Sequence, residues 1–340
     1  MNKNDVLVSV IMSVYNDEKY LNEALDSIFA QTIQNFELII IDDCSTDHTV
    51  EIIEGYHDNR IRLIQNEQNC GLTKNLNKAL SYASGKYIAR MDGDDKSSPI
   101  RFEKQIELLE QNPELMLISC RAHMFGEEDL VSDIQGTPKQ LQVMMLIRPV
   151  LAHPGFMMRR ELIDAHGFRY DETYRSAQDY NFAVRVAREF SIGITEDVLL
   201  EYRVHKKQVS SVHGNEQMNN AARVRNMQLE WLGIQLSNEQ KEILEKWAKE
   251  VRNVPMRDYK VAYQLIELYM NGNQKTDIYS KLELKEELTK LLFQWIIRSK
   301  SLYVFRILLD LCRISHGNLR LLCIKLCEMF KFKGKLKYRG

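Results

Sequence analysis

Residues 87–95 read YIARMDGDD, a largely apolar strand pattern that runs directly into three aspartates around one glycine. Like charges at this spacing repel one another, and a solvated turn or a bound cation relieves the repulsion between Asp92, Asp94 and Asp95. A solvated turn tolerates such a cluster, whereas a divalent-cation site requires one. Whether these aspartates form a solvated turn or a cation site therefore depends on the fold around the end of this strand.

The strand pattern at 87–91 is the fourth member of a regular series. Short apolar runs alternate with helical patterns, and Ser45 or Thr46 is expected to cap one of the helices. The predicted strands are 6–14, 36–41, 61–65, 87–91, 115–121 and 198–205, and the predicted helices are 18–31, 47–56, 71–84, 99–111 and 178–190. Because helices commonly connect parallel strands, this order predicts an α/β fold with a Rossmann-like, mostly parallel sheet and helices on both faces.

The pattern changes near residue 215. From there it is helical to the end of the sequence, without repeats or a low-complexity linker. We therefore expect an α/β catalytic domain over residues 1–215 and a helical C-terminal region over residues 216–340.

The end of the chain is strongly basic, although the whole sequence carries a net charge of −1. Residues 291–340 hold eleven Lys and Arg against two acids, a net charge of +9, among apolar side chains such as Trp295 and Phe305. Helices of this kind lie in membrane interfaces and favour anionic lipid, so we expect a basic amphipathic tail that docks on an anionic membrane. A packed helical subdomain with a solvated basic end is the alternative. No nucleic-acid module accompanies the basic residues, so nucleic acid is not an expected partner.

Cysteine usage and the N-terminus predict a cytoplasmic protein, and the basic tail predicts that it is peripheral on the inner face of the membrane. The six cysteines have no C-x-x-C spacing, and free thiols suit a reducing compartment. The N-terminus lacks the basic segment and apolar core of a signal peptide. No run reaches the roughly 18 apolar residues of a bilayer span.

Polar residues follow three of the predicted strands. The first strand ends in SVYND (13–17), the second in DDCS (42–45) and the fourth in DGDD (92–95). Ligands of open parallel sheets bind beyond the carboxyl ends of the strands, so these ends predict one site with an aromatic face, hydrogen-bonding carboxylates and a cation cluster.

Common nucleotide and calcium motifs do not explain this site. The sequence has no G-x-G-x-x-G after a strand and no G-x-x-x-x-G-K-[ST]. An EF-hand beginning at Asp92 fails at Lys96 and Ser97. A phosphate-bound Mg²⁺ or Mn²⁺ held by Asp92 and Asp94 is the better explanation.

Five separated motifs resemble one family. SVIMSVYND, IIIDDCSTDHT, GLTKNLNKAL, YIARMDGDD and AQDYNFAVRVA are, in this order, similar to the inverting family 2 glycosyltransferases with a GT-A fold, of the bacterial surface-glycan type. The resemblance covers roughly residues 6–210. It implies transfer of a sugar from a UDP-sugar to a hydroxyl of a glycan or lipid-linked saccharide, with Mn²⁺ or Mg²⁺ as cofactor.

The resemblance also implies roles on the donor side. Asp94 would bind the cation directly, Asp92 would reach the ribose or the ion, and His205 would approach the metal or the diphosphate. The nucleotide-sugar residues would be Ser13, Tyr15, Asp43, Lys74, Asn77 and Asp92. The alternatives are a core aromatic at Tyr15, a helix cap at Asp43, a solvated helix face at Lys74 and Asn77, a solvated turn at Asp92 and Asp94, and a structural histidine at His205.

On the acceptor side, the resemblance implies that Asp179 is the catalytic base and that His153 lines the acceptor pocket. Many members have Glu-Asp where this chain has Gln178 and Asp179. An inverting transfer needs one carboxylate to take the proton of the acceptor hydroxyl. Helix capping by Asp179 and a structural role for His153 are the alternatives.

Two other functions compete with this interpretation. A sugar nucleotidyltransferase would need a glycine-rich N-terminal loop, and residues 9–17 contain no glycine. A non-catalytic scaffold of the same fold would bind nucleotide or glycan only, and the presence of Asp92, Asp94 and Asp179 argues against it.

Overall fold

The computed structural model describes residues 6–205 and 214–298, which form two compact units. The described residues up to Glu230, with Ile278–Ser280, form the first unit, and Trp231–Asp277 with the residues from Lys281 form the second. The first unit extends beyond residue 215 because the helix that follows bonds into it. Gln228 Nε2 in that helix donates to the carbonyl of Met145 at 2.9 Å.

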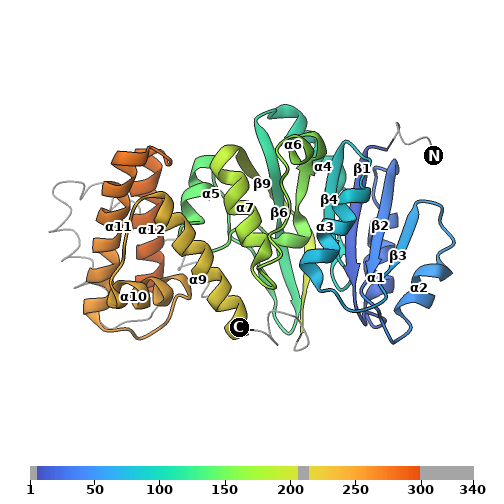
Figure 1. The fold of residues 1–340 in the computed structure, drawn as a ribbon, viewed down its shortest axis with the longest axis horizontal. Coiled ribbons are helices and arrows are strands. Elements are labelled where there is room, and N and C mark those ends of the chain that lie inside the picture. The colour runs from blue at the N-terminus through green and yellow to red at the C-terminus, as the bar shows by residue number, and fades with distance from the viewer. Residues whose placement is uncertain (1–5, 206–213, 299–340) are drawn as a thin grey trace, which may run out of the picture. The chain divides into compact units, whose positions relative to one another are not determined.

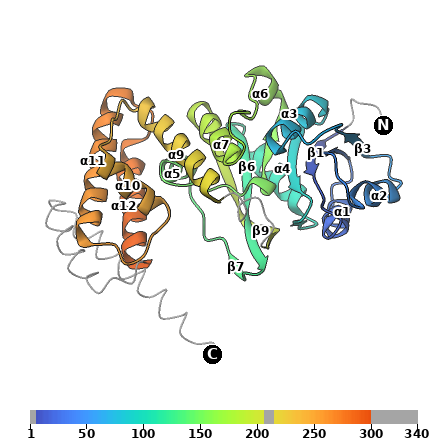
Figure 2. The ribbon, with the colours of Figure 1, turned by 60° about the horizontal axis from the view of Figure 1, so that its bottom comes forward.

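A nine-stranded mixed sheet forms the centre of the first unit, with helices on both faces (Figures 1 and 2). The strand order is β3-β2-β1-β4-β8-β6-β9-β5, and β7 pairs with β6. The strands are β1 (Val8–Val14), β2 (Phe36–Asp42), β3 (Ile61–Gln65), β4 (Tyr87–Asp92), β5 (Lys96–Ser97), β6 (Leu115–Gly126), β7 (Leu130–Val131), β8 (Met157–Arg159) and β9 (Ser191–Val204). The helices of this unit are α1 (Leu21–Phe29), α2 (Thr49–Gly55), α3 (Leu72–Tyr82), α4 (Arg101–Gln111), α5 (Pro138–Met144), the 3₁₀ turn η1 (His153–Gly155), α6 (Arg160–Ala165), α7 (Gln178–Glu189) and α9 (Gly214–Trp231).

The parallel half of the sheet confirms the predicted series of strands and helices. β1 pairs in parallel with β2 and β4, and β2 pairs in parallel with β3. Successive side chains of a strand point to opposite faces, and Val10 and Met12 of β1 enter one core with Leu25 of α1 and Phe102 of α4. Burial on both faces explains why β1, β2 and β4 are largely apolar.

The other half of the sheet is mixed rather than mostly parallel. β8 is antiparallel to β4 and to β6, whereas β9 is parallel to β6. β9 begins at Ser191 and not at residue 198, because Leu115 of β6 pairs with Ser191. Gly193 interrupts the strand pattern of this segment, and pairing with β6 continues the strand through it.

The expected cap of α2 is wrong. Neither Ser45 nor Thr46 caps the helix, and Asp47 Oδ1 instead accepts from the backbone N–H of Thr49 at 3.0 Å. Ser45 and Thr46 instead bond to Asn16 in the loop after β1. The backbone N–H of Asn16 donates to Ser45 Oγ at 3.0 Å, and Asn16 Oδ1 accepts from the backbone N–H of Thr46 at 2.8 Å. These bonds join the loops that follow β1 and β2.

The described part of the second unit is helical. It contains α10 (Asn238–Ala248), α11 (Met256–Thr276) and α12 (Lys281–Arg298), and Ser237 and Gln240 form a capping box at the start of α10. None of the described helices is both long and apolar enough to span a bilayer.

The start of the expected basic tail, residues 291–298, belongs to the packed helix α12. Trp295 is fully buried, and its Nε1 donates to the carbonyl of Val251 at 2.8 Å. Its ring centroid lies 4.8 Å from that of Tyr259. Trp295 is therefore part of a core and is not available for insertion into a membrane, contrary to the sequence-based expectation. The rest of the expected tail, including Phe305, lies outside the described residues.

Candidate active site

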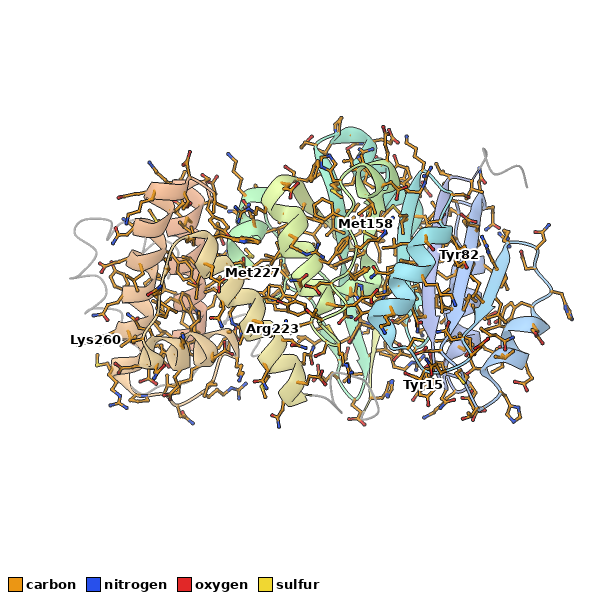
Figure 3. All side chains as sticks on the ribbon, viewed as in Figure 1. Tyr15, Tyr82, Met158, Arg223, Met227 and Lys260 are labelled. Carbon is orange, nitrogen blue, oxygen red and sulfur yellow. The ribbon has the colours of Figure 1, made fainter. Side chains whose placement is uncertain are left out.

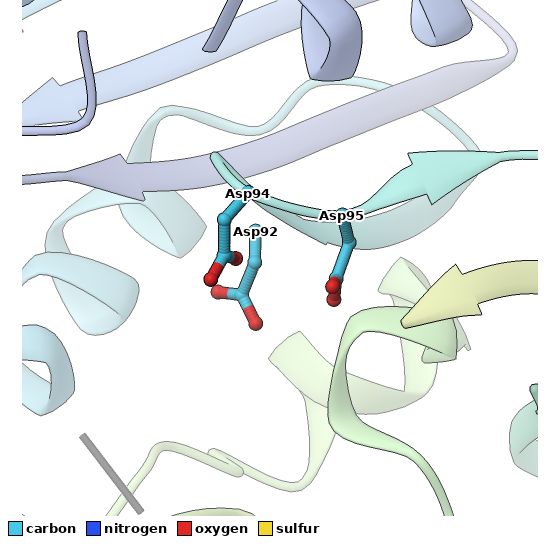
Figure 4. Close-up of side chains that lie close together, drawn as sticks. All are labelled: Asp92, Asp94 and Asp95. Atoms are coloured by element: carbon cyan, nitrogen blue, oxygen red, sulfur yellow. The ribbon is translucent and has the colours of Figure 1, made fainter. Parts of the chain in front are cut away.

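The register of the parallel strands brings the three polar strand ends together. Ser13 of β1 lies opposite Asp92 of β4, and Val14 lies opposite Asp42 of β2. The chain then turns from Asp92 through Gly93 to Asp94 and Asp95, and one carboxylate oxygen of each aspartate lies within 4.8 Å of the others (Figure 4).

Arg90 neutralises the first acid of this cluster. It is buried on β4, and its two terminal nitrogens donate to the two carboxylate oxygens of Asp92. Burial raises the pKa of Asp92 to about 6, although the positive charge of Arg90 opposes this effect. Sequence reasoning gave Arg90 no role. Its spacing was the available signal, because side chains two positions apart on a strand share a face.

Asp94 has different partners, and His205 is one of them. Asp94 Oδ2 lies 3.0 Å from His205 Nε2, and the backbone carbonyl of Asp94 accepts from Arg203 Nε at 2.8 Å. The side chains of Asp94 and His205 are about one-fifth exposed. The structure therefore brings both predicted residues to the accessible side of the cluster.

Asp95 lies at the buried side of the cluster. Its Oδ1 accepts from the backbone N–H of Arg203 at 2.7 Å, and its Oδ2 has no hydrogen-bond partner in the described part of the chain. Burial, followed by the charges of Asp92 and Asp94, raises the pKa of Asp95 well above its usual value. Carboxylate oxygens suit Mg²⁺ and Mn²⁺, and a bound cation would relieve this repulsion, so the donor set fits a divalent ion.

Asp17 is a fourth acid beside the cluster, and sequence reasoning assigned it no role of its own. Its Oδ2 accepts from the backbone N–H of Tyr15 at 3.2 Å. A Cβ atom at Gly93 would lie 2.9 Å from the same oxygen, which shows how closely the two strand-end loops approach. Burial raises the pKa of Asp17 to about 7, and the charges of Asp94 and Asp92 act in the same direction. Only tertiary contact of the two loops could reveal this acid as part of the cluster.

The ends of β1 and β2 supply the predicted nucleoside side of the site. Tyr15 is 49% exposed at the end of β1 (Figure 3). Asp43 accepts from the backbone N–H groups of Cys70 and Gly71 at 2.7 and 2.9 Å and from Asn66 Nδ2 at 2.9 Å. These hydrogen bonds, with a further one from Asn75, outweigh burial and lower the pKa of Asp43. Asp43 is therefore an ionised carboxylate that holds the loop before α3.

The two residues predicted on α3 lie in different surroundings. Lys74 is exposed. Asn77 pairs with the backbone of Tyr170, donating to its carbonyl and accepting from its N–H, both at 2.9 Å. Asn75 is the α3 residue that contacts a predicted nucleotide residue, because its Nδ2 donates to Ser13 Oγ at 3.1 Å.

Asp179 lies in the first turn of α7 and is not the capping residue. The N-cap position is Ala177, which adopts a left-handed conformation with φ of 55°, and no side chain caps this helix. Burial raises the pKa of Asp179, while the N–H of Tyr180 and the charge of Arg90 oppose the shift. Asp179 also raises the pKa of Asp92, so it lies within electrostatic range of the acid cluster.

His153 is held in a buried turn between the strands. Its Nε2 lies 2.9 Å from the hydroxyl of Tyr170. Burial, followed by the charge of Arg90, lowers its pKa well below the usual value, so the imidazole is neutral. Two side chains of α4 hold the same turn: Arg101 donates to the carbonyl of Pro154 and Gln105 to that of Gly155, both at 2.7 Å.

This arrangement joins an accessible aromatic ring, an acid cluster whose oxygens suit a divalent cation, and a carboxylate of raised pKa. Comparisons with known proteins agree with the family that the sequence motifs resemble. The sequence profile of Glycosyl transferase family 2 matches residues 9–167. An uncharacterized glycosyltransferase of Haemophilus influenzae is 30% identical over 81% of this chain and 89% of its own length. The Bacillus subtilis protein TuaG, named for teichuronic acid biosynthesis, is 38% identical over 39% of this chain and 50% of its own length.

Two solved structures share the fold. Staphylococcus aureus TarS 1-349 in complex with UDP-GlcNAc is similar with a TM-score of 0.56, at 20% identity, over 84% of this chain and 92% of that one. The mannosyltransferase PcManGT from Pyrobaculum calidifontis, in complex with GDP-Man and Mn²⁺, gives a TM-score of 0.50 at 16% identity, over 92% and 81%. The sheet with flanking helices is a GT-A fold. The chain belongs to glycosyltransferase family 2, and the protein is a glycosyltransferase.

Proposed function

We propose that the protein transfers a sugar from a UDP-sugar to a hydroxyl of a glycan or lipid-linked saccharide, with inversion at the anomeric carbon. The observation that carries this proposal is the acid cluster of Asp92, Asp94 and Asp95 within 4.8 Å. Its place at the strand ends is where nucleotides bind in such sheets. TarS in complex with UDP-GlcNAc and PcManGT in complex with GDP-Man support a nucleoside diphosphate sugar as the donor.

The residue that would hold a Mn²⁺ or Mg²⁺ ion directly is Asp94, with Asp92 toward the ribose and His205 beside Asp94. Such an ion, when bound, supplies positive charge against the diphosphate leaving group. The Mn²⁺ in the PcManGT structure supports this assignment.

On the donor side, the exposed ring of Tyr15 packs on the base, and the ammonium group of Lys74 attracts the phosphates. Ser13 binds the nucleoside from the end of β1. Asp43 accepts from the imide N–H of uracil. Because protein donors already surround this carboxylate, the base displaces one of them.

On the acceptor side, the carboxylate of Asp179 accepts the proton of the attacking hydroxyl as its oxygen bonds to the anomeric carbon and the bond to UDP breaks. The raised pKa of Asp179 suits this role, since a more basic carboxylate takes a proton more readily. Neutral His153 lines the acceptor pocket through the turn that carries it.

We also propose that the acceptor belongs to surface-glycan synthesis. TuaG, which is 38% identical to part of this chain, supports this class of acceptor. Enzymes of this kind would act at the inner face of the membrane, where lipid-linked acceptors are exposed to the cytoplasm.

The test is a panel of UDP-sugars with Mn²⁺, Mg²⁺ or EDTA, in which release of UDP is measured with and without saccharide acceptors. We expect one donor to give metal-dependent release that Asp94→Ala abolishes. Equal release in EDTA would contradict the metal assignment, and no release from any nucleotide sugar, with every acceptor class tried, would contradict the donor class.

A further inference from the structure

We propose that Arg90 withholds Asp92 from the cation, so that a divalent ion binds tightly only together with the diphosphate of the donor. The inference rests on the proposed function and deepens it, because it names the order in which the ion and the nucleotide bind. It concerns a residue outside the roles assigned so far.

The first argument is the geometry of the Arg90–Asp92 pair. Both oxygens of Asp92 accept from the guanidinium group. The side chain of Arg90 is 2% exposed and that of Asp92 is 27% exposed, so Arg90 contacts Asp92 from the buried side. Each carboxylate oxygen has two lone pairs, and the guanidinium uses one on each. A cation that approaches from the open side would meet only the remaining lone pairs of a neutralised carboxylate.

The second argument is that Arg90 cannot release Asp92 without losing the carboxylate to which it bonds, although the charge of Asp95 also acts on Arg90. Within the described residues, Asp92 is the carboxylate that forms an ion pair with Arg90, and Arg90 Nε has no hydrogen-bond partner. A buried charge that loses its partner is strongly unfavourable. The pair therefore persists when a cation approaches.

The third argument is the small donor set that remains. Asp95 is buried and already accepts from the N–H of Arg203. Of the three aspartates of the cluster, Asp94 is the partly exposed carboxylate that is left, with His205 at 3.0 Å. Mg²⁺ and similar ions are commonly held by one or two carboxylates and completed by substrate phosphates. With Asp92 neutralised, the diphosphate becomes a necessary part of the ion's ligand set.

The test measures Mn²⁺ binding to the full chain without nucleotide, by the electron paramagnetic resonance signal of free Mn²⁺. The variants are Arg90→Lys, whose ammonium makes a single contact in place of the guanidinium's two, and Arg90→Gln, which removes the charge. We expect Mn²⁺ to bind at least about tenfold more tightly to Arg90→Gln than to the natural protein, equivalent to about 1.4 kcal/mol. Arg90→Lys should lie between the two. In saturating UDP, the difference should shrink, because the diphosphate supplies the missing ligands.

Arg159→Gln is the matched control. Arg159 lies on β8, and it bonds to the carbonyls of Leu115 and Leu109 instead of a carboxylate of the cluster. Its removal should leave the Mn²⁺ affinity without nucleotide unchanged. The double variant Arg90→Gln/Asp92→Asn should not bind Mn²⁺ more tightly than the natural protein. The carboxylate of Asp92, which Arg90→Gln makes available to the ion, is absent from it.

Equal or weaker Mn²⁺ binding in the Arg90 variants would overturn the inference. Circular dichroism checks folding, and if Arg90→Gln does not fold, the affinity of Arg90→Lys decides. If metal-dependent transfer is intact and the Arg90 variants bind Mn²⁺ as tightly as the natural protein does, the inference fails and the proposed function stands. If the natural protein binds no Mn²⁺ even with UDP, the metal assignment of the proposed function fails together with the inference.

Discussion

Asp179 combines a position in the first turn of α7 with a pKa that burial raises. Asp179→Asn keeps the shape of the side chain but removes the base, so we expect the transfer rate to fall by about 10²–10⁴. Binding of UDP in the presence of Mn²⁺ should be nearly unchanged, because the residue acts on the acceptor. Calorimetry and steady-state kinetics check both parts. A turnover close to that of the natural protein would leave Asp179 with a structural role.

His153 makes a prediction for stability as a function of pH. Its pKa is lowered in the folded protein, so the folded state keeps a neutral imidazole where the unfolded chain binds a proton. The stabilising contribution is therefore complete above the unfolded pKa of about 6.5 and is lost as the pH falls below it, by up to about 1.4 kcal/mol per pH unit. Urea unfolding between pH 8 and pH 5 measures this loss.

His153→Gln should remove that part of the pH dependence. His48→Gln is the control, because the side chain of His48 is exposed. If the two variants show the same pH dependence, the imidazole of His153 is not the group responsible.

At the scale of elements, two asparagines of α3 have different hydrogen-bond partners, and we expect different effects when each is removed. Asn77→Ala leaves the backbone N–H and carbonyl of Tyr170 without their partners at 2.9 Å, so we expect a loss of about 1–3 kcal/mol of unfolding free energy and little change in UDP affinity. Asn75→Ala removes the donor to Ser13 and should weaken UDP binding by about tenfold, equivalent to 1.4 kcal/mol. Urea unfolding and calorimetry give the two measurements. If Asn77→Ala weakens UDP binding and Asn75→Ala does not, Asn77 belongs to the nucleotide site, as the sequence predicted.

For the whole molecule, binding of UDP should raise the free energy of unfolding. UDP should stabilise the protein only with Mn²⁺ or Mg²⁺, by about 2.7 kcal/mol at a hundredfold excess over Kd. Thermal melts measure this shift, and Asp94→Asn, which keeps the shape of the side chain, should abolish it. An equal shift in EDTA would show that UDP binds without the cation.

The second unit sets where the chain can be shortened. A chain that ends at residue 290 lacks buried residues of α12 such as Leu292 and Trp295, and it should lose the packing of that unit. A chain that ends at Arg298 keeps these buried residues. Co-sedimentation with anionic and neutral liposomes then tests the proposal that the basic residues after 298 dock on a membrane. Equal sedimentation of both chains would place membrane binding elsewhere.

The sequence by itself determined the parallel strands, their polar ends and the acid cluster at the end of β4, because hydrophobic periodicity and residue order are local properties. It also contained the Arg90–Asp92 pair, since two residues of one strand share a face. Only the tertiary structure decided which of the asparagines of α3 meets Ser13, that Asp17 touches the loop at Gly93, and that Trp295 is a core residue. It also decided the extent of β9, because pairing with β6 continues the strand through Gly193. These outcomes depend on contacts between segments distant in the chain, and no local pattern of residues encodes such a contact.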